Sequence, residues 1–341
     1  MAGSGRAAAG PGRLPVTAAW VALAACLLSA CSFNPPLDLA AMFPGYPPVL
    51  LASVPFYPQR EYQCGPAALA GVLGAAGVAT SPAALAPQVY LPGRQGSLQQ
   101  ELLAATRRAG RVPYLIPADP AVLFTQLHSG RPVLVLQNLR THHFPVWHYA
   151  VLVGFDPAAN EVQLNSGPEQ GLVMAAPAFL RTWDWAGRWA LVALRPGELP
   201  THAQPSAFIE AVAAFEQVAG GNAAAPAWRA ALHRWPGEPA PYLALGNLAY
   251  ARGDLPLALD HYRRGLGASP GNPALGNNLA SVLGELGCAR TAAALLEPIQ
   301  AGLAADSNWH PVIAATLAEL ALQTQGGGDW CAALYPGWAE P

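Results

Sequence analysis

The sequence predicts two folded parts: an α+β domain over residues 49–197, with helices packed on an antiparallel sheet, and an all-α domain over residues 205–341. Two observations lead to this prediction. In the first part, helical patterns are followed by four short apolar runs that are bounded by turn residues. In the second part, the apolar spacing becomes helical and a pattern recurs after 34 residues.

The composition narrows the class of protein. The chain has 341 residues, of which 52% are hydrophobic and only 11% are charged, so a sizeable core is available. The net charge is −2 and no basic stripe is present, which argues against a nucleic-acid partner. We find no CxxC pair and no His/Cys cluster with zinc spacing, so we expect no cofactor or metal.

The first 30 residues have the layout of a secretory signal. Arg6 and Arg13 precede an almost wholly apolar stretch over residues 14–30, which is short for a membrane span. The stretch ends in Leu28-Ser29-Ala30-Cys31, which resembles the lipobox of bacterial lipoproteins. That resemblance implies cleavage before Cys31 and lipidation of its thiol. Ser32 then implies sorting to the outer membrane of the cell envelope, facing the periplasm, and the Pro-rich segment 31–48 is predicted to be a tether.

The α+β domain is predicted to contain two helices and four strands. The helices are Ala67–Ala76 and Leu98–Ala109, the second with Ser97 as its cap. The strands are Pro132–Leu139, His148–Phe155, Glu161–Leu164 and Trp189–Leu194.

The all-α domain shows an internal repeat. Positions that match at a separation of 34 residues include Trp228 and Tyr262, and Leu232 and Leu266. The unit Pro239–Asn272 fits the tetratricopeptide pattern, with a generic helical bundle as the alternative. Such repeats form concave surfaces that bind peptides or proteins, so we expect a protein partner on this surface. Cys288 and Cys331 could form one bridge in an oxidising compartment, which the sequence leaves open.

Cys64 is the candidate nucleophile. It directly precedes a predicted helix, and Pro66 suits the first helical turn. The positive end of the helix dipole and the unpaired N–H groups there favour a thiolate, which is the reactive form of cysteine. The alternative is an inert buried cysteine.

His148 is the candidate base, because a histidine at the start of a buried strand is held rigidly and can still face a cleft. The loop residues His142 and His143, and His128 near a helix end, are the less favoured alternatives. Asn165 closes the next strand and would lie beside His148 if the two strands pair, so we expect it to orient the imidazole. Asp156 is the alternative for that role.

These residues resemble the C39-type peptidases, a papain-like group of cysteine peptidases, over roughly Val54–Leu194. The motifs are Gln59…Cys64-Gly65-Pro66-Ala67, the strand from His148 to Asp156, and Asn165. The resemblance implies Cys64 as nucleophile, His148 as base, Gln59 as oxyanion donor, with Gln63 as its competitor, and Asn165 as orienting residue. Two features depart from the family: Gln59 lies five rather than six residues before the cysteine, and Asn165-Ser166-Gly167 replaces an Asp-Pro pair.

The layout looks closest to bacterial lipoproteins that join a C39-like domain to tetratricopeptide repeats. The leading hypothesis is therefore hydrolysis of an envelope peptide or protein, with the repeats recruiting substrate or partner and a lipid anchor at the membrane. One alternative is a catalytically inactive C39-like binding module. The other is acyl transfer or amide hydrolysis on a non-peptide substrate, since a Cys-His-Asn site supports several acyl chemistries.

Overall fold

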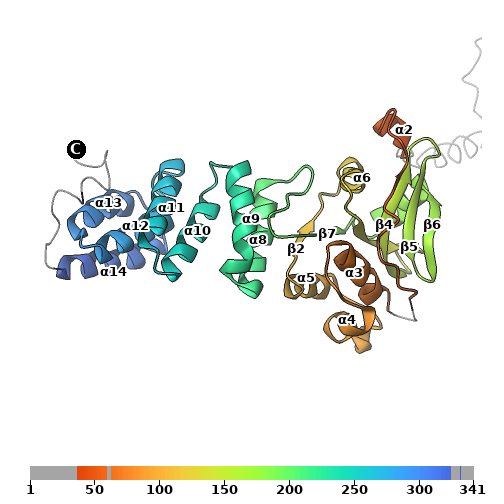
Figure 1. The fold of residues 1–341 in the computed structure, drawn as a ribbon, viewed down its shortest axis with the longest axis horizontal. Helices are drawn as coiled ribbons and strands as arrows, with labels where there is room; N and C mark the ends of the chain where they lie inside the picture. Colours follow the sequence, from red (N-terminus) through yellow and green to blue (C-terminus); the bar gives the residue numbers. More distant parts are fainter. Residues whose placement is uncertain (1–36, 60–62, 324–330, 332–341) are drawn as a thin grey trace, which may run out of the picture.

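A computed structural model describes residues 37–59, 63–323 and 331. The chain is elongated, with an α/β part at one end and a row of helices extending from it (Figure 1). The predicted leader and Cys31 lie outside the described residues. In the described part of the chain, no helix has both the length and the apolar character that a membrane span requires.

One antiparallel sheet forms the centre of the α/β part. Its strand order is β2-β7-β3-β4-β5-β6, with the short strand β1 also paired to β4. All four predicted strands are present as β3, β4, β5 and β7, whereas β1, β2 and β6 were not predicted. The strands are β1 (Val49–Leu50), β2 (Val112–Leu115), β3 (Val133–Asn138), β4 (Trp147–Asp156), β5 (Glu161–Ser166), β6 (Glu169–Ala175) and β7 (Ala190–Leu194).

Helices cover both faces of this sheet. Tyr149, Val151 and Val153 of β4 pack on the face that carries α3, α4 and α5, whereas Ala150 and Leu152 pack on the face that carries α6 and α7. The alternation follows from the two-residue period of a strand. The helices are α2 (Leu39–Met42), α3 (Cys64–Ala75), α4 (Pro82–Val89), α5 (Gln99–Arg108), α6 (Pro120–His128) and α7 (Ala176–Asp184).

The two predicted helices are α3 and α5, but the predicted cap of the second is wrong. Leu98 is the N-cap of α5 and provides no side-chain hydrogen bond. The Ser97 hydroxyl is buried without a hydrogen-bond partner instead, because it packs against the start of α3.

The segment before β1 is packed over residues 37–43, so the prediction of a tether over residues 31–48 is wrong there. Leu37, Leu39 and Phe43 are buried in the core beside α6. Asn160, at the turn between β4 and β5, holds the segment by donating to Leu37 O and accepting from Leu39 N, each at 3.0 Å. The prolines restrict this segment without keeping its apolar side chains in water, and burial of those side chains decides its position.

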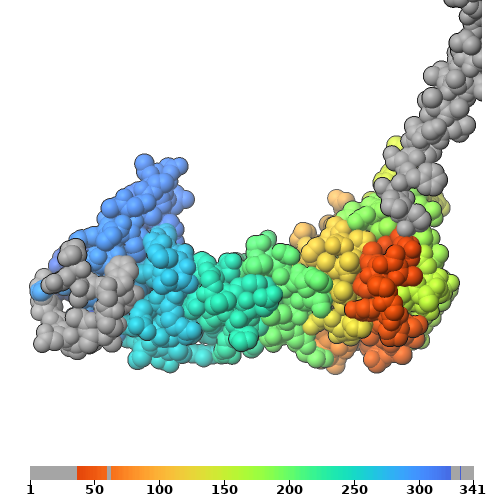
Figure 2. Space-filling model, turned by 90° about the horizontal axis from the view of Figure 1, so that it is seen from above, coloured from red at the N-terminus to blue at the C-terminus, as the bar shows by residue number. Residues whose placement is uncertain are grey.

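The second part consists of helical hairpins in a row. Phe208, Val212 and Phe215 of α8 belong to the same buried core as Tyr114 of β2, so the first hairpin is continuous with the α/β part. Figure 2 shows that the last helices, in blue, rise from the row and leave a hollow between themselves and the first domain. The helices are α8 (Pro205–Ala219), α9 (Gly221–Arg234), α10 (Pro239–Ala251), α11 (Leu255–Ala268), α12 (Pro273–Glu285), α13 (Ala289–Ala301) and α14 (Trp309–Leu322).

A disulfide joins Cys288 and Cys331, the pair that the sequence left open. It lies in the core of the last helices, where both cysteines are buried. The bridge closes a loop of 43 residues and ties the far end of the chain to the start of α13.

We predict that removing this bridge destabilises the helical end of the chain. The variant Cys288→Ala/Cys331→Ala should lose about 2–4 kcal/mol of unfolding free energy, because the open loop gains entropy when it unfolds. Denaturant unfolding followed by circular dichroism measures this, and dithiothreitol should have the same effect on the unmodified protein. Cys64→Ala is the control, since it leaves the bridge intact. Equal midpoints with and without the bridge would contradict the prediction.

Candidate active site

Cys64 is the first residue of α3 and is half-buried. Gln63, the N-cap, forms no side-chain hydrogen bond with the helix. The local sequence favours this start, because Pro66 needs no N–H partner in the first turn. Cys64 is also the one cysteine with a free thiol in the part of the chain that the structure describes.

Gly65 is required by the close approach of the segment before α5. A Cβ atom added at Gly65 would lie 2.3 Å from Ser97 Oγ and 2.6 Å from Ser97 Cβ. Ser97 O also accepts a hydrogen bond from the Tyr149 hydroxyl at 3.3 Å. The absence of a side chain at Gly65 therefore lets α3, the Ser97 segment and β4 meet at Cys64.

His148 lies near the start of β4, opposite Gln137 of β3, and is half-buried. Its Nε2 atom lies 2.8 Å from Ser166 Oγ, at the end of β5. His142 and His143, the loop alternatives, are exposed and do not line the cavity described next.

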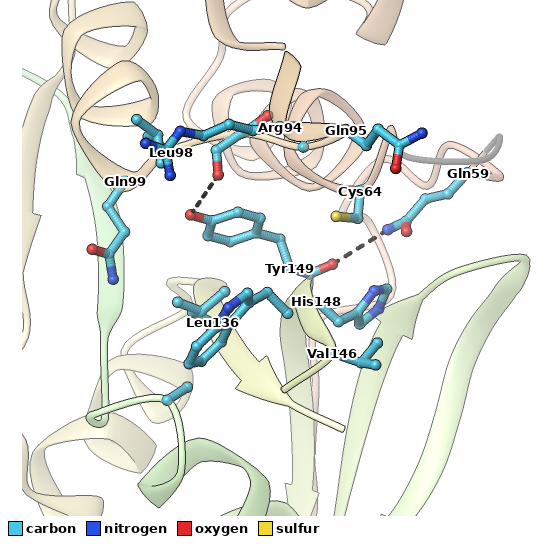
Figure 3. A pocket seen from close by; sticks show the side chains of 14 residues that line it. Gln59, Cys64, Arg94, Gln95, Leu98, Gln99, Leu136, Val146, His148 and Tyr149 are labelled. Atoms are coloured by element: carbon cyan, nitrogen blue, oxygen red, sulfur yellow. Dashed lines mark hydrogen bonds between the residues drawn. The ribbon is translucent and has the colours of Figure 1, made fainter. Parts of the chain in front are cut away.

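Cys64 and His148 line one cavity of about 870 Å³. Figure 3 shows Cys64, Gln59 and His148 grouped at one end, with Leu98 and Gln99 at the other. The Gln63 alternative is not among the lining residues. These residues are Gln59, Cys64, Arg94, Gln95, Gly96, Ser97, Leu98, Gln99, Leu136, Val146, Trp147, His148, Tyr149 and Ala186. The walls combine an apolar surface with polar groups near the thiol, an arrangement typical of a binding cleft.

Gln59 lies beside the thiol, as Figure 3 shows. Its side-chain Nε2 donates to Tyr149 O at 3.5 Å, a long and therefore weak hydrogen bond. Its backbone N–H donates to Gly167 O at 3.1 Å, which fixes the chain position. The side-chain amide is thus held in the cavity by a contact that a stronger acceptor could replace.

The sequence led us to expect a thiolate at Cys64, but the surroundings of the resting site favour the neutral thiol. Burial raises the pKa of the Cys64 thiol above its ordinary value, and the N–H groups of Tyr149, Gly65 and Cys64 offset only part of this effect. Burial lowers the pKa of His148. Although both residues are described, no hydrogen bond joins Cys64 Sγ to the His148 ring. Near neutral pH the resting groups are therefore a thiol and a neutral imidazole, because desolvation outweighs the dipole of the helix start.

The structure does not bring Asn165 to His148. Asn165 pairs with Val151 in the β4–β5 ladder, and its Oδ1 accepts from Gly171 N at 3.1 Å. Asp156, the other candidate, caps the β4–β5 turn by accepting from the N–H groups of Ala158 and Ala159. The residue that contacts His148 is Ser166, which the sequence analysis did not single out as a site residue. The two-residue period could have indicated it, since Ser166 shares a face of β5 with Leu164.

Metal ligands were not expected in this chain. In the described ranges, no group of three or more His, Cys, Asp and Glu side chains is arranged to hold a metal ion.

A cleft lined by a cysteine from a helix start and a histidine from a strand combines a nucleophile with a base. Residues 51–184 match the model of the family described as the Peptidase_C39 like family. The part of the chain that is similar to this family contains Gln59, Cys64 and His148.

A solved structure is also similar. It is described as the crystal structure of a candidate C39-like peptidase from Bacillus anthracis, and it is 19% identical in sequence. The similarity covers 44% of this chain and 98% of the other, with a TM-score of 0.36. The curated proteins include no match.

We predict that Gly65→Ala disrupts the site through Ser97. The added Cβ has no room, so unfolding free energy should fall by about 1–3 kcal/mol. Ser97→Gly in the same chain removes both clashing atoms and should recover most of the loss. Denaturant unfolding of the single and double variants measures the coupling. Gly93→Ala is the control, since its added Cβ meets nothing within 4 Å. Purely additive effects of the two changes would contradict this packing.

Proposed function

We propose that the C39-like domain is a cysteine peptidase in which Cys64 is the nucleophile and His148 the general base. The observation that carries the proposal is that both residues line one cavity, from a helix start and a strand start that are far apart in sequence. The family match over residues 51–184 supports peptidase chemistry for this domain. The proposed substrate is a peptide or protein of the cell envelope.

The reaction begins from a neutral pair. As Cys64 Sγ attacks the carbonyl carbon of the substrate, the thiol proton passes to His148, and the carbonyl oxygen becomes an oxyanion. The imidazolium then gives this proton to the leaving amine, and the C–N bond breaks to leave a thioester on Cys64. Water, deprotonated by His148, releases the acyl group and restores the thiol.

Gln59 is the proposed oxyanion donor. Its amide N–H would exchange the weak contact with Tyr149 O for the charged substrate oxygen, which is the stronger acceptor. The backbone N–H of Cys64, at the start of α3, is the proposed second donor. Loss of one such donor typically lowers turnover about 10²–10³-fold, which is the effect we expect for Gln59→Ala.

We predict that a substrate-like peptide electrophile labels Cys64 much faster than iodoacetamide does. The reason is that binding of the peptide places its reactive carbon beside the Cys64 thiol, and His148 takes the proton of that thiol. His148→Ala should abolish this advantage, and His143→Ala, in the exposed loop, should keep it. Intact mass spectrometry measures both rates.

The pH dependence follows from the two pKa directions. Iodoacetamide labelling should rise only at pH values above the ordinary range of a thiol, because burial raises the pKa of Cys64. Peptide-directed labelling should persist below pH 6.5 and fall at lower pH, because burial lowers the pKa of His148 and keeps it a base there.

The alternative is a C39-like binding module without catalysis. It is favoured by the raised pKa of Cys64 and by the absence of a hydrogen bond between the thiol and the described His148 ring. Under this alternative, the peptide electrophile labels Cys64 no faster than iodoacetamide, and His148→Ala changes neither rate. The same experiment therefore separates the two functions.

We propose that the helical hairpins are tetratricopeptide repeats that recruit the substrate or a protein partner. Two Gly–Tyr contacts between α10 and α11 support this interpretation. A Cβ at Gly246 would lie 2.3 Å from the Tyr262 ring, and one at Gly265 would lie 2.7 Å from Tyr242 Cβ. Each tyrosine thus fills the space beside a glycine on the partner helix. Helices α10 and α11 therefore pack closely at positions that belong to the sequence repeat. The hollow beside the last helices in Figure 2 is the proposed recruiting surface.

We propose that Cys31 carries the lipid anchor and that the protein faces the periplasm from the outer membrane. The Cys288–Cys331 disulfide supports an oxidising compartment. Because Leu37 is already buried in the core, few residues separate Cys31 from the folded domain. The domain would therefore act within about 20 Å of the lipid surface, at about 3.5 Å per extended residue.

We predict that Cys31→Ser releases the protein from the membrane. In a bacterial host, the unmodified chain should fractionate with membranes and incorporate labelled fatty acid, whereas the variant should do neither. Cys26→Ser, which lies inside the predicted leader, is the matched control and should behave like the unmodified chain. Membrane attachment of Cys31→Ser would refute the anchor.

A further inference from the structure

We infer that Ser166 is the positioning residue for His148, in the role that a carboxylate or an amide would otherwise fill. The inference rests on the proposed function, since it assigns a part of the same site. It is carried by the contact of 2.8 Å between His148 Nε2 and Ser166 Oγ.

The strand register supports this assignment. By strand alternation, His148 belongs to the face of β4 that carries Ala150 and Leu152, and Ser166 belongs to the face of β5 that carries Leu164. The β5–β6 ladder shifts register between Leu164 and Ser166, at the point where the hydroxyl meets the ring. Asn165 belongs to the opposite face, where it pairs with Val151 and accepts from Gly171 N. Ser166, which contacts the imidazole, and Asn165, which accepts from β6, are therefore adjacent residues of β5.

The backbone around Ser166 holds its hydroxyl in place. Ser166 pairs with Glu169 across the β5–β6 hairpin, whose two-residue turn is Gly167-Pro168. Gly167 has φ +58°, which a hairpin turn of this length requires at its first position. Gly167 O also accepts from the backbone N–H of Gln59. The turn thus holds both the hydroxyl that contacts His148 and the segment that carries Gln59.

The chemistry follows from the bond that Ser166 makes. When Ser166 Oγ accepts from Nε2–H, the lone pair of the neutral ring lies on Nδ1, which is free to take the proton of Cys64. A hydroxyl can accept from Nε2–H or donate to Nε2, and the inferred role requires the accepting arrangement. Unlike a carboxylate, the hydroxyl adds no negative charge to stabilise the imidazolium. The site would therefore operate with a weaker base than one with an acidic partner.

The surroundings of His148 contain few other charges. The titratable or charged groups that line the same cavity are Cys64 of α3, Tyr149 of β4 and Arg94 of the 3-10 turn Pro92–Arg94. Glu169 of β6 lies opposite Ser166 in the ladder. None of the lining residues in the described ranges is a carboxylate, so the polar contact of the ring is left to Ser166.

The direct test is nitrogen NMR of the His148 ring, which needs no catalytic turnover. In the Cys64→Ala background, the ring should titrate below pH 6.5 with its neutral form protonated on Nε2. Ser166→Ala should mix the two tautomers, and Ser166→Thr should keep the original one. Ser166→Asp should raise the pKa of His148 by a unit or more, since a carboxylate then faces the imidazolium. Asn165→Ala is the control and should leave the tautomer unchanged.

Turnover of a peptide substrate gives the second readout. Ser166→Ala should lower kcat about tenfold or more with little change in KM. The loss should be smaller than the whole contribution of a positioned base, which is about 10²–10⁴-fold. Ser166→Thr should restore most of it. Unchanged tautomers in Ser166→Ala, or a tautomer change in Asn165→Ala alone, would overturn the inference. If the tautomer responds to Ser166 as expected while no variant cleaves peptides, the positioning role stands and the proposed peptidase function fails.

Discussion

The packing of helix α3 against strand β4 is the contact on which the site depends. Leu69 and Leu73 of the helix share a buried core with Val151 and Val153 of the strand. Small residues allow the helix to lie close, since a Cβ added at Gly71 would already touch Val151 at 3.4 Å. This contact brings a thiol at the helix start and a histidine at the strand start to the walls of one cavity, although more than 80 residues separate them. Loss of the contact would separate the proposed nucleophile from the proposed base without changing either side chain.

The same burial that aligns these groups also determines their charge. Desolvation favours the neutral forms of both Cys64 and His148, and it outweighs the N–H groups that point at the sulfur. A resting thiolate would need a compensating charge close to the sulfur, and no charged group contributes to the shift of the Cys64 pKa. In the proposed reaction, His148 therefore acts by taking the proton during attack, and its orientation by the β5–β6 turn is as important as its presence.

The helical array is not an independent attachment. Its first hairpin contributes Phe208 and Phe215 to the core that also contains Tyr114 of the sheet, and Gln204 N donates to the Tyr114 hydroxyl. A shared core resists bending at the junction, so the hollow of the array is held at a constant distance and orientation from the cleft. This coupling gives the proposed recruitment a physical basis, because a captured chain would be held at a fixed distance from Cys64.

The sequence by itself determined the α+β order, the four core strands, the helix after Cys64 and the histidine at the start of β4, because local turn chemistry and apolar periodicity specify them. The structure begins that helix at Cys64 itself, three residues before the predicted start at Ala67. Only the tertiary structure decided which polar side chain reaches His148. A one-residue step along β5 exchanges Asn165 for Ser166, and strand register is set by pairing with β4 and β6 rather than by the residues themselves. Burial likewise decided the neutral state of the thiol and the packing of the segment from Leu37, because desolvation depends on neighbours that are distant in sequence.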